Sequence, residues 1–476
     1  MSSYLGIDVG TTNTKVLALH GDGSSQILHS SPTPVYTRKG VSFFDMAAIE
    51  ETLSGAVDRA RKNLDLRGIG FSSVGESVIP LDAEGAPLAD PVVWYDRVTL
   101  DLFRELGDRS DLFPYETRGL GMKHTLGVYK MLWMKQNMPE VAGVRHWLPV
   151  SSYIPYRWSG EMRWDFSQAC RSHLLDIHER SWDGRALGEL GLAGELPPAD
   201  YMGSRVGTTK AGIPLYLGGH DHIVGMNGVR ILFGSDTIFD SIGSASVLGG
   251  TVSLGAEEMR RTLAASDDLI IGVAQAPGAY YAENSTRYFG KLLEATARLL
   301  GAADIGLFYE EMNQSLQQRS EAAPLLPRFF VEGDRIVRQE KTGFDIRNLD
   351  VTMPREDVVW GLYLYLAVTT QLIVEELQGL FQKPRFVAGG GTSRNSLLMQ
   401  VTADVLNRPI TLLEQSELSG LGAALSAAES AGDTSTLEHT RHRLETRTLE
   451  PSARQALRAR EAAELREALI TEWNRT

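Results

Sequence analysis

Short apolar runs bounded by turn-forming residues dominate the first part of this chain and predict β-strands. They lie at residues 4–9, 15–20, 26–29, 68–74, 77–81 and 214–219. Residues 46–63 differ, because Ile49, Leu53, Val57 and Ala60 recur every three or four positions. That spacing predicts a helix with one buried face. A second helix is predicted over residues 126–136, so this part of the chain mixes strands and helices.

The same alternation starts again in the second half of the chain. Strands are predicted over 237–242 and 385–388, and helices over 288–300 and 397–406. Each half begins with strands and a polar turn, around Gly10 in the first half and Gly243 in the second. We therefore expect two related domains that face one another across a cleft.

The most apolar window spans residues 358–374. It contains Thr369, Thr370 and Gln371 and is too short and too polar for a membrane span. A buried helix is expected instead, preceded by acidic residues of the kind that favour a helix N-terminus. The charged tail from Leu437 is expected to be helical and to pack at the periphery.

The turn between the first two predicted strands concentrates polar groups. It carries Asp8, Gly10, Thr11, Thr12, Asn13 and Lys15. Glycine allows a tight turn and close approach to a ligand, and converging N–H, hydroxyl and ammonium donors suit phosphate oxygens. Asp8 would hold Mg²⁺ through water. The alternative is an ordinary hairpin with a polar turn.

Composition narrows the classes of protein to consider. The chain has 476 residues, 43% of them hydrophobic, and a net charge of −13 from 47 basic and 60 acidic residues. This balance argues against non-specific nucleic-acid binding. Cys170 is the single cysteine, so no internal disulfide can form and a cytoplasmic setting fits. A buried apolar role is expected for it rather than a nucleophilic one. The first residues show no charged-then-apolar pattern, so no signal segment is expected there.

Three common signatures are missing from the sequence. It has no Gly-x4-Gly-Lys-Ser/Thr phosphate loop, no Gly-x-Gly-x-x-Gly dinucleotide fingerprint and no His-Glu-x-x-His zinc motif. A phosphate-binding function would therefore have to use another type of loop.

Several stretches, taken together and in order, resemble the FGGY carbohydrate kinases, which belong to the actin, sugar-kinase and heat-shock ATPase superfamily. These stretches are Asp8–Lys15, Glu76, Trp94–Asp96, Gly219–Asp221, Gly243-Ser244, Gly389–Asn395 and Ser419–Ala424. The resemblance covers essentially the whole chain. One motif alone would be weak support for the resemblance, but several motifs in the order found in the family are unlikely to arise by chance.

The resemblance implies an α/β fold of two ribonuclease-H-like (actin-like ATPase) domains. Each would have a mixed sheet flanked by helices, with the ligand cleft between the two. The implied division is an N-terminal sugar-binding domain at 1–229 and a C-terminal nucleotide-binding domain at 230–436. A helical tail at 437–476 would pack on them. Residues 419–424 resemble the helix that closes the nucleotide-binding domain.

Asp221 matches the catalytic aspartate of the family. A sugar hydroxyl must lose its proton as its oxygen attacks phosphorus, and a carboxylate within hydrogen-bonding reach accepts it. Taken alone, an aspartate after Gly-Gly-His would more often be a turn or cap residue. His220 and His222 flank it, and either could tune its pKa, touch substrate or serve packing.

The resemblance also implies the nucleotide contacts. Thr11, Thr12, Asn13 and Lys15 match the first phosphate loop, with Asp8 as the Mg²⁺-organising carboxylate. Gly243 and Ser244 match the second phosphate loop, and Gly390, Gly391 and Asn395 match the adenosine contacts. Many relatives continue the second loop with Thr-Ser where this chain has Ser244 and Ala245. The implied cofactors are ATP and Mg²⁺.

The implied substrate contacts lie between the two loops in sequence. Glu76 occupies the position of an acid that accepts hydroxyl protons in polyol-binding relatives, and Trp94 and Asp96 lie in the substrate loop. An indole face suits sugar C–H groups and a carboxylate accepts hydroxyl hydrogen bonds. The family spacing Trp-x-Asp-x-Arg is broken here, because Val98 occupies the arginine position.

The function implied is ATP-dependent phosphorylation of a small ketose or polyol. Segment 76–97 has no strongly basic cluster, which favours a neutral sugar over a sugar acid as the substrate. The competing functions are those of an actin-like ATPase and of a non-catalytic sugar sensor. The expected partners are the sugar and ATP, with neither nucleic acid nor membrane, and a homodimer is compatible with the sequence.

Overall fold

The computed structural model describes residues 2–107, 109–265, 269–286, 288–317, 326–331, 343–415 and 417–473. The chain forms two compact units, each assembled from three separate segments. The first contains residues 1–235, 250–282 and 417–444, and the second contains residues 236–249, 283–416 and 445–476. These discontinuous units are not the three consecutive segments expected from the sequence, because the chain passes between the units several times. The functional boundaries at residues 229 and 436 stay a prediction.

The first unit is built around a mixed sheet in the order β13-β14-β6-β1-β2-β3. Its strands are β1 (Ser2–Val9), β2 (Asn13–His20), β3 (Ser25–Pro32), β6 (Asp65–Ser73), β13 (Arg205–Thr208) and β14 (Pro214–His220). β1, β6 and β14 run parallel, whereas β2, β3 and β13 are antiparallel to their neighbours.

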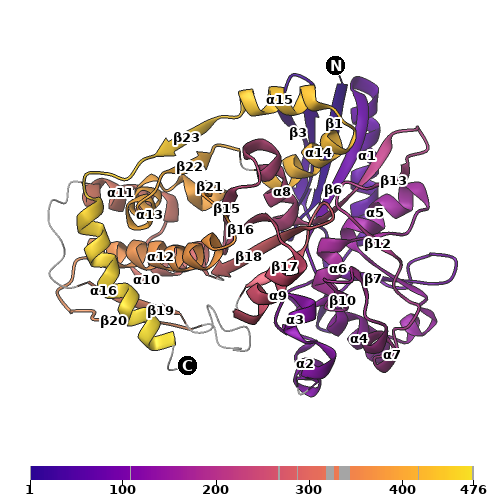
Figure 1. Cartoon of the computed structure of the whole chain (residues 1–476), viewed down its shortest axis with the longest axis horizontal. Coiled ribbons are helices and arrows are strands. Elements are labelled where there is room, and N and C mark those ends of the chain that lie inside the picture. The colour runs from indigo at the N-terminus through magenta and orange to yellow at the C-terminus, as the bar shows by residue number, and fades with distance from the viewer. Residues whose placement is uncertain are drawn as a thin grey trace. The chain divides into compact units, whose positions relative to one another are not determined.

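Helices and short hairpins complete this unit (Figure 1). Its helices are α1 (Met46–Asn63), α2 (Leu100–Glu105), α3 (Tyr115–Arg118), α4 (Gly127–Asn137), α5 (Val150–Ser159), α6 (Phe166–Ser172), α7 (Gly184–Glu189), α8 (Asp221–Phe233), α9 (Ala256–Ala265), α14 (Leu418–Ser430) and α15 (Thr434–Arg443). The remaining strands are β4 (Val35–Arg38), β5 (Val41–Phe44), β7 (Val78–Leu81), β8 (His146–Pro149), β9 (Trp164–Asp165), β10 (Leu175–Asp176), β11 (Ser181–Trp182), β12 (Ala199–Asp200) and β17 (Ile270–Val273).

Helix α1 forms where the apolar spacing predicts it. The Asp45 side chain caps its N-terminus by accepting a hydrogen bond from the Ala48 N–H at 3.0 Å, which satisfies a donor that the helix leaves open. Ile49 and Leu53 are buried on its inner face, and Arg61 lies in its last turn, where a positive charge is favourable. Local signals therefore define both ends of this helix.

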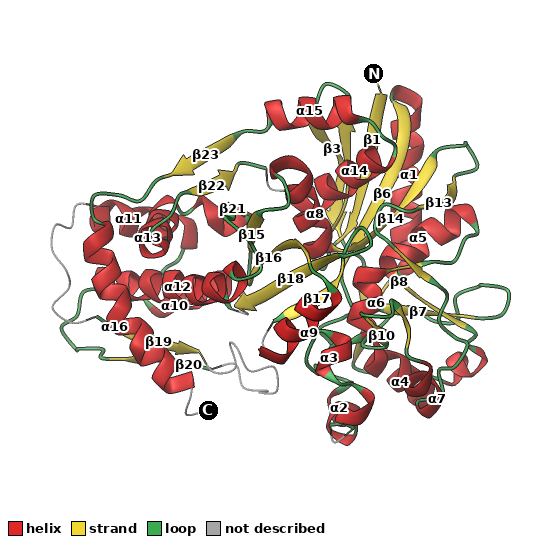
Figure 2. Ribbon diagram, viewed as in Figure 1, coloured by secondary structure: helices red, strands yellow, loops and turns green. Residues whose placement is uncertain are grey.

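Helix α14 comes from late in the chain yet packs on the first unit, against β1, β2, β6 and α8 (Figure 2). Its approach is so close that Gly6 has no room for a side chain, since a Cβ there would lie 1.8 Å from the Gly420 carbonyl oxygen. Gly70 meets the Ala423 carbonyl in the same way, at 2.0 Å. Residues 419–424 therefore pack on the sheet of the first unit, and their expected role in closing the nucleotide-binding domain stays a prediction.

In the second unit, strands β16, β15, β21, β22 and β23 are neighbours in this order within a seven-stranded mixed sheet. Its elements are β15 (Thr237–Ile242), α10 (Phe289–Leu299), α11 (Ile305–Gln317), β19 (Arg328–Val331), β20 (Phe344–Arg347), α12 (Arg355–Gln378), β21 (Arg385–Gly389), α13 (Ser396–Leu406), β22 (Ile410–Leu413), β23 (Thr446–Leu449) and α16 (Gln455–Trp473). Strands β16 (Ser246–Ser253) and β18 (Ala279–Thr286) contain the points at which the chain passes between units.

The two sheets share the spatial order and the directions of their central strands. In each, the first strand of a hairpin (β1–β2 or β15–β16) lies beside two further parallel strands (β6 and β14, or β21 and β22), with an antiparallel strand (β13 or β23) at the edge. The connections differ at that edge, because β13 precedes β14 in the chain whereas β23 follows β22. The hairpin turns hold Gly10 and Gly243 in equivalent places. The prediction of two related α/β domains is confirmed.

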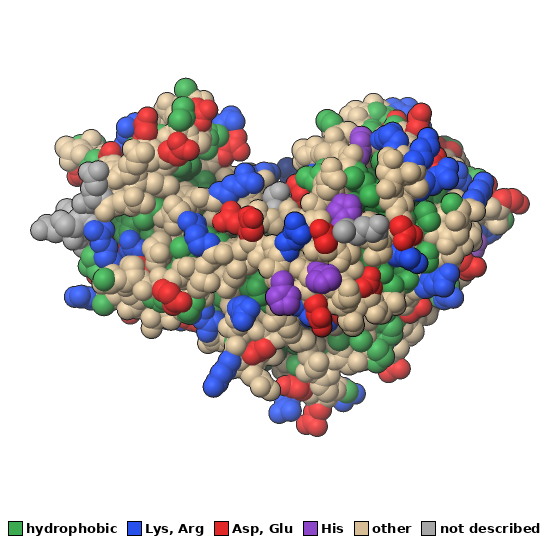
Figure 3. Space-filling model, turned by 90° about the horizontal axis from the view of Figure 1, so that it is seen from above, with side chains coloured by type: hydrophobic (Ala, Val, Ile, Leu, Met, Phe, Trp, Pro, Cys, Tyr) green, Lys and Arg blue, Asp and Glu red, His purple; other side chains and the backbone are tan. Residues whose placement is uncertain are grey.

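Helix α12 is long and apolar enough to cross a membrane, but 89% of its most apolar window is buried inside the protein. The prediction of a buried helix is confirmed. The tail is not wholly helical, because β23 lies between α15 and α16 and pairs with β22. On the face seen in Figure 3, acidic and basic side chains are interspersed.

Candidate functional site

The first half of the candidate site lies where β1, β6 and β14 end. Asp8 is in register with Ser72, and Ser73 with His220. Parallel strands end at the same edge, and adjacent strands are about 4.8 Å apart. Asp8 and Asp221 thus lie on either side of β6, close enough for Asp221 to raise the pKa of Asp8. Residues far apart in sequence share one edge.

Asp221 is the first residue of α8, and its carboxylate lies between two imidazoles. Its Oδ1 lies 3.3 Å from Nε2 of His220 and 3.9 Å from Nε2 of His222. Burial lowers the pKa of His220 well below its usual value, with Arg171 adding to the effect, so this imidazole is neutral. The side chain of Asp221 is 24% exposed, which leaves it accessible to a ligand. These three side chains offer metal-donor atoms within 4.8 Å of one another, a grouping that was not predicted from the sequence.

Glycines hold the strand before Asp221 against its neighbours. A Cβ at Gly218 would lie 1.3 Å from the Phe71 carbonyl oxygen, and one at Gly219 would lie 2.4 Å from Oγ of Ser167. Ser167 in turn accepts the His220 N–H at 2.9 Å. The Gly-Gly pair therefore fixes the position of Asp221 through close packing.

Glu76 follows β6 and has a left-handed backbone, with φ of 63°, which costs a non-glycine residue free energy. Its side chain is 10% exposed and lies 3.8 Å from Nη1 of Arg171. Burial raises the pKa of Glu76, and Arg171, Lys130 and Lys123 oppose that rise. These cations were not predicted from the sequence, because it is α4, α6 and the loop before α4 that bring them to the end of β6.

Trp94 and Asp96 lie in the loop after β7. The Trp94 indole N–H donates to Oγ1 of Thr11 at 2.8 Å, so the predicted substrate loop meets the first polar turn. Asp96 accepts the N–H groups of Ser42 at 2.9 Å and Val98 at 3.1 Å. Each carboxylate oxygen of Asp96 thus accepts a backbone N–H, and the observed role of this side chain is to fix the conformation of the loop.

The first polar turn keeps part of its donor set. The Gly10 N–H donates to the Asn13 carbonyl at 3.0 Å and is thereby used inside the turn. The N–H groups of Thr11 and Thr12 donate to no acceptor within the described residues, and Thr12 is exposed. These two residues offer the donors that a phosphate would need.

Asp8 and Lys15 lie on the strands beside that turn. Burial and the Asp221 carboxylate raise the pKa of Asp8 to about 7. Its Oδ1 is buried and makes no hydrogen bond within the described part of the chain, which fits a carboxylate that awaits a cation or its water shell. The Lys15 ammonium lies 2.5 Å from Oε2 of Glu417, so a phosphate would share it with that acid.

The second unit places the Gly243 turn beside the N-terminus of α10. The carbonyl of Gly243 accepts the Gly290 N–H at 3.2 Å and the hydroxyl of Thr392 at 3.2 Å, and the Ser244 carbonyl accepts the Lys291 N–H at 3.2 Å. Gly243 and Ser244 are exposed. Lys291, which no sequence motif singles out, and Thr392, from the Gly389–Asn395 motif, join this turn.

Gly390 and Gly391 follow β21 at the same edge of the sheet. Gly390 has φ of 108°, and a Cβ there would lie 2.5 Å from the Ile242 carbonyl oxygen, whereas the corresponding space at Gly391 is open. A cavity of about 190 Å³ borders Gly390 and is also lined by Arg394, Glu414 and Arg447. The open backbone leaves room for a ligand group.

Asn395 has a structural role in addition to the predicted one. Its Oδ1 accepts the Leu398 N–H at 3.2 Å and Nδ2 of Asn313 at 3.1 Å, and its Nδ2 donates to the Tyr363 hydroxyl at 2.7 Å. The residue therefore caps α13. An adenosine contact would have to use the one remaining amide hydrogen.

Asp240 on β15 is a buried carboxylate that was not predicted as a site residue. It is 1% exposed, Oδ1 accepts the Ser246 hydroxyl at 2.6 Å, and burial raises its pKa to about 7. A carboxyl whose pKa is raised by folding contributes stability that is present below its unfolded value near 4 and is lost as the pH rises through 7.

Unfolding free energies of Asp240→Asn, measured by urea denaturation between pH 4 and pH 8, should fall less steeply with pH than those of the unmodified protein. Equal slopes would contradict this, whatever the absolute stability of the variant.

Comparisons with known proteins agree with this geometry. Profiles of the N-terminal and C-terminal domains of the FGGY family of carbohydrate kinases match residues 3–228 and 245–431. These two matches span most of the chain.

Individual relatives point the same way. The chain is 26% identical over 440 residues to a glycerol kinase from Thermococcus onnurineus, covering 88% of this chain and 87% of that one. It is 26% identical over 455 residues to an L-fuculokinase from Haemophilus influenzae, covering 89% and 94%. Its fold is similar to that of a ligand-bound xylulose kinase from Lactobacillus acidophilus, with a TM-score of 0.84, 18% identity and full coverage of both chains.

Kinases of this family use ATP and transfer a phosphoryl group to a sugar hydroxyl. The two matched profiles, the repeated sheet topology and the shared strand-end site all fit that assignment. The chain belongs to the FGGY family of carbohydrate kinases.

Proposed function

We propose that this protein transfers the γ-phosphoryl group of ATP to a hydroxyl of a small sugar, a ketose or polyol, with Asp221 as general base. The observation that carries the proposal is the shared edge of β1, β6 and β14. It places the accessible carboxylate of Asp221 near Asp8 and Glu76. The reaction needs three acidic groups on the sugar side. Asp221 would accept the proton, Glu76 would accept hydrogen bonds from substrate hydroxyls, and Asp8 would organise the cation.

In the proposed step the acceptor oxygen forms a bond to the γ-phosphorus while the bond from that phosphorus to the β–γ bridging oxygen breaks. The hydroxyl proton passes to Asp221, and ADP leaves. Neutral His220, 3.3 Å from the Asp221 carboxylate, does not neutralise this base. Glu76 would accept hydrogen bonds from other substrate hydroxyls, and the Trp94 face would cover sugar C–H groups.

The nucleotide contacts are proposed on the same basis. Gly10, Thr11, Thr12, Asn13 and Lys15 would form one phosphate loop. Gly243 and Ser244 would form the other, and Gly390, Gly391 and Asn395 would lie beside the adenosine. Mg²⁺, organised through water by Asp8, would neutralise charge on the phosphates, which phosphoryl transfer requires more than covalent help.

A coupled ADP-release screen over ketoses, alditols and aldonates tests the proposal. We expect sugar-dependent ADP release with at least one neutral ketose or alditol. ADP release that is equal with and without sugar would identify an ATPase instead. Sugar binding by calorimetry without any ADP release would identify a sensor.

One observation favours a second candidate, a kinase for a sugar acid. Arg171, Lys130 and Lys123 all act on Glu76 electrostatically, although segment 76–97 itself lacks a basic cluster. Lys130 is fully buried and its pKa is lowered to about 8, while its Nζ donates to the Thr125 carbonyl at 2.5 Å. Three cations around one acid could also receive a substrate carboxylate.

Arg171→Gln separates the two candidates. For a sugar-acid kinase, kcat/KM for the preferred aldonate should fall about 10- to 100-fold, because a charge-assisted hydrogen bond is worth about 1.5–3 kcal/mol. For a neutral-sugar kinase, the variant should change KM for the sugar only because Glu76, which would bind the sugar hydroxyls, loses its neighbouring cation. Aldonates should remain poor substrates. KM for ATP, measured in the same assays, serves as the internal control.

A further inference from the structure

A hollow of about 710 Å³ lies in the second unit, where β21 and β22 begin. Lys383, Arg385 and Arg408 contribute three positive charges to its lining, which contains no carboxylate among the residues that the structure describes. The whole chain carries a net charge of −13. The lining of this hollow, which we call the basic pocket, is therefore positively charged, whereas the protein as a whole is negatively charged.

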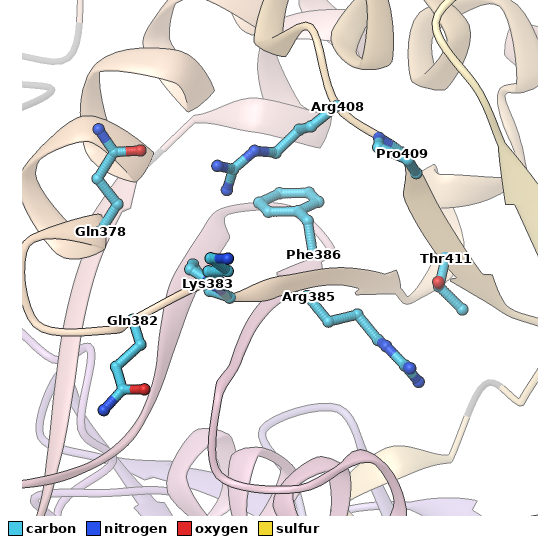
Figure 4. A pocket seen from close by; sticks show the side chains of 9 residues that line it. Gln378, Gln382, Lys383, Arg385, Phe386, Arg408, Pro409 and Thr411 are labelled. Carbon is cyan, nitrogen blue, oxygen red and sulfur yellow. The ribbon is translucent and has the colours of Figure 1, made fainter.

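Arg408 has an unused donor in the basic pocket. Its Nη1 is buried and makes no hydrogen bond within the described residues. A buried donor of a charged group without an acceptor costs free energy, so such a group calls for an explanation. In Figure 4 the guanidinium extends above the Phe386 ring towards Gln378. The guanidinium therefore brings its positive charge to the pocket, although the buried Nη1 itself presents no surface to a ligand.

Lys383 is held beside the same ring (Figure 4). The Asp236 carboxylate accepts the backbone N–H groups of Gln382 at 3.1 Å and Lys383 at 2.8 Å. That carboxylate thus fixes the loop and is not part of the pocket lining. No carboxylate of the described residues lies within ion-pairing distance of the Lys383 ammonium, which can therefore bind a ligand.

The floor of the basic pocket is apolar. Phe386 is 1% exposed, and Pro384 and Pro409 flank it. Because the Phe386 ring is buried, Pro384 and Pro409 supply the apolar surface that a ligand can contact. Apolar surface beside cations suits a ligand that has an organic body and an anionic group. A volume of about 710 Å³ lies within the range of small-metabolite sites, which is about 300–1,000 Å³.

The basic pocket is not a second entrance to the nucleotide residues. Arg385 is the first residue of β21, and Gly390 follows its last residue. Five extended residues span about 17 Å, so Gly390 and Gly391 lie at the opposite edge of the sheet. A ligand bound here would be remote from the predicted adenosine contacts and would act as an effector rather than a reactant.

We propose that the basic pocket binds a phosphate monoester of a small metabolite. The phosphate lies between Lys383 and Arg408 and the organic body lies against Pro384 and Pro409. A phosphate monoester carries about −1.5 to −2 charges at neutral pH. It offers several oxygens to the planar donor fork of arginine. This inference does not depend on the proposed kinase activity, because binding can be measured without turnover.

Isothermal titration calorimetry with ribose 5-phosphate, ribose and inorganic phosphate tests the proposal at constant ionic strength. Ribose 5-phosphate is expected to bind with a Kd below about 1 mM, more tightly than inorganic phosphate, and ribose should not bind at this site. Lys383→Gln and Arg408→Gln should each weaken ribose 5-phosphate binding on the order of 10-fold. Arg408→Lys should restore part of the loss.

Arg460→Gln is the matched control, since it removes one exposed charge from α16 and should leave binding unchanged. Thermal melts of every variant show whether it is folded. Inorganic phosphate binding as tightly as the ester would overturn the role of the organic body. Binding that persists in folded Arg408→Gln and Lys383→Gln would place the ligand elsewhere and overturn the proposal.

Discussion

Asp221→Asn is expected to lower kcat for sugar phosphorylation by about 10²–10⁴-fold, the usual contribution of a general base. Asparagine keeps the size of the side chain and can still accept a hydrogen bond from the His222 N–H, which Oδ1 of Asp221 accepts at 2.8 Å. The fold and the packing at Gly219 should therefore persist. Affinity for ATP should change little, because the nucleotide contacts are proposed on other residues.

The measurement is steady-state ADP release, with nucleotide affinity from calorimetry on the same preparations. Asp58→Asn is the matched control, since Asp58 is 62% exposed and pairs with Arg61 on the surface of α1. It should retain full activity. Turnover of Asp221→Asn within a few-fold of the unmodified enzyme would refute the base assignment. Loss of nucleotide binding would point instead to a structural role.

Gly6→Ala is expected to reduce the free energy of unfolding by about 3 kcal/mol, near the upper end of the usual cost of overpacking. The new methyl group would lie 1.8 Å from the Gly420 carbonyl oxygen, and backbone on both sides prevents easy relief. Helix α14 would have to move away from β1. Because Glu417, just before α14, pairs with Lys15, the first polar turn should loosen as well.

Urea denaturation followed by tryptophan fluorescence measures the loss. Gly188→Ala provides the same chemical change in α7, where the added methyl group would meet nothing within 4 Å and φ is not positive. That control should be unchanged or more stable by up to about 1 kcal/mol. Equal stability of the two variants would show that α14 does not pack on β1 as described.

Sequence patterns predicted the elements whose signals are local. Helix α1 was predicted over residues 46–63, because apolar spacing and capping both act within a few residues. The strand that leads to Asp221 and the buried helix α12 followed for the same reason. The family resemblance then supplied the order of the polar turns, which the two sheets display in equivalent places.

The rest depended on contacts that no local pattern records. Arg171 lies beside Glu76 only because α6 packs near the end of β6. Strand β23 forms because its neighbour β22 offers an open edge, although the surrounding tail is helical. Asn395 reads as a ligand contact in the sequence, yet its amide is engaged by Leu398, Asn313 and Tyr363. Asp240 is noticeable only once its burial is known.

The late return of residues 417–444 to the first unit has a consequence for biosynthesis. A ribosome that has released the first 235 residues has not yet made the helix that covers Gly6 and Gly70. The N-terminal sheet must wait, with one apolar face uncovered, until nearly the whole chain has emerged. A fragment that ends at residue 235 would lack helix α14, and a supplied 417–444 peptide would restore that helix but not residues 250–282, which also belong to the unit.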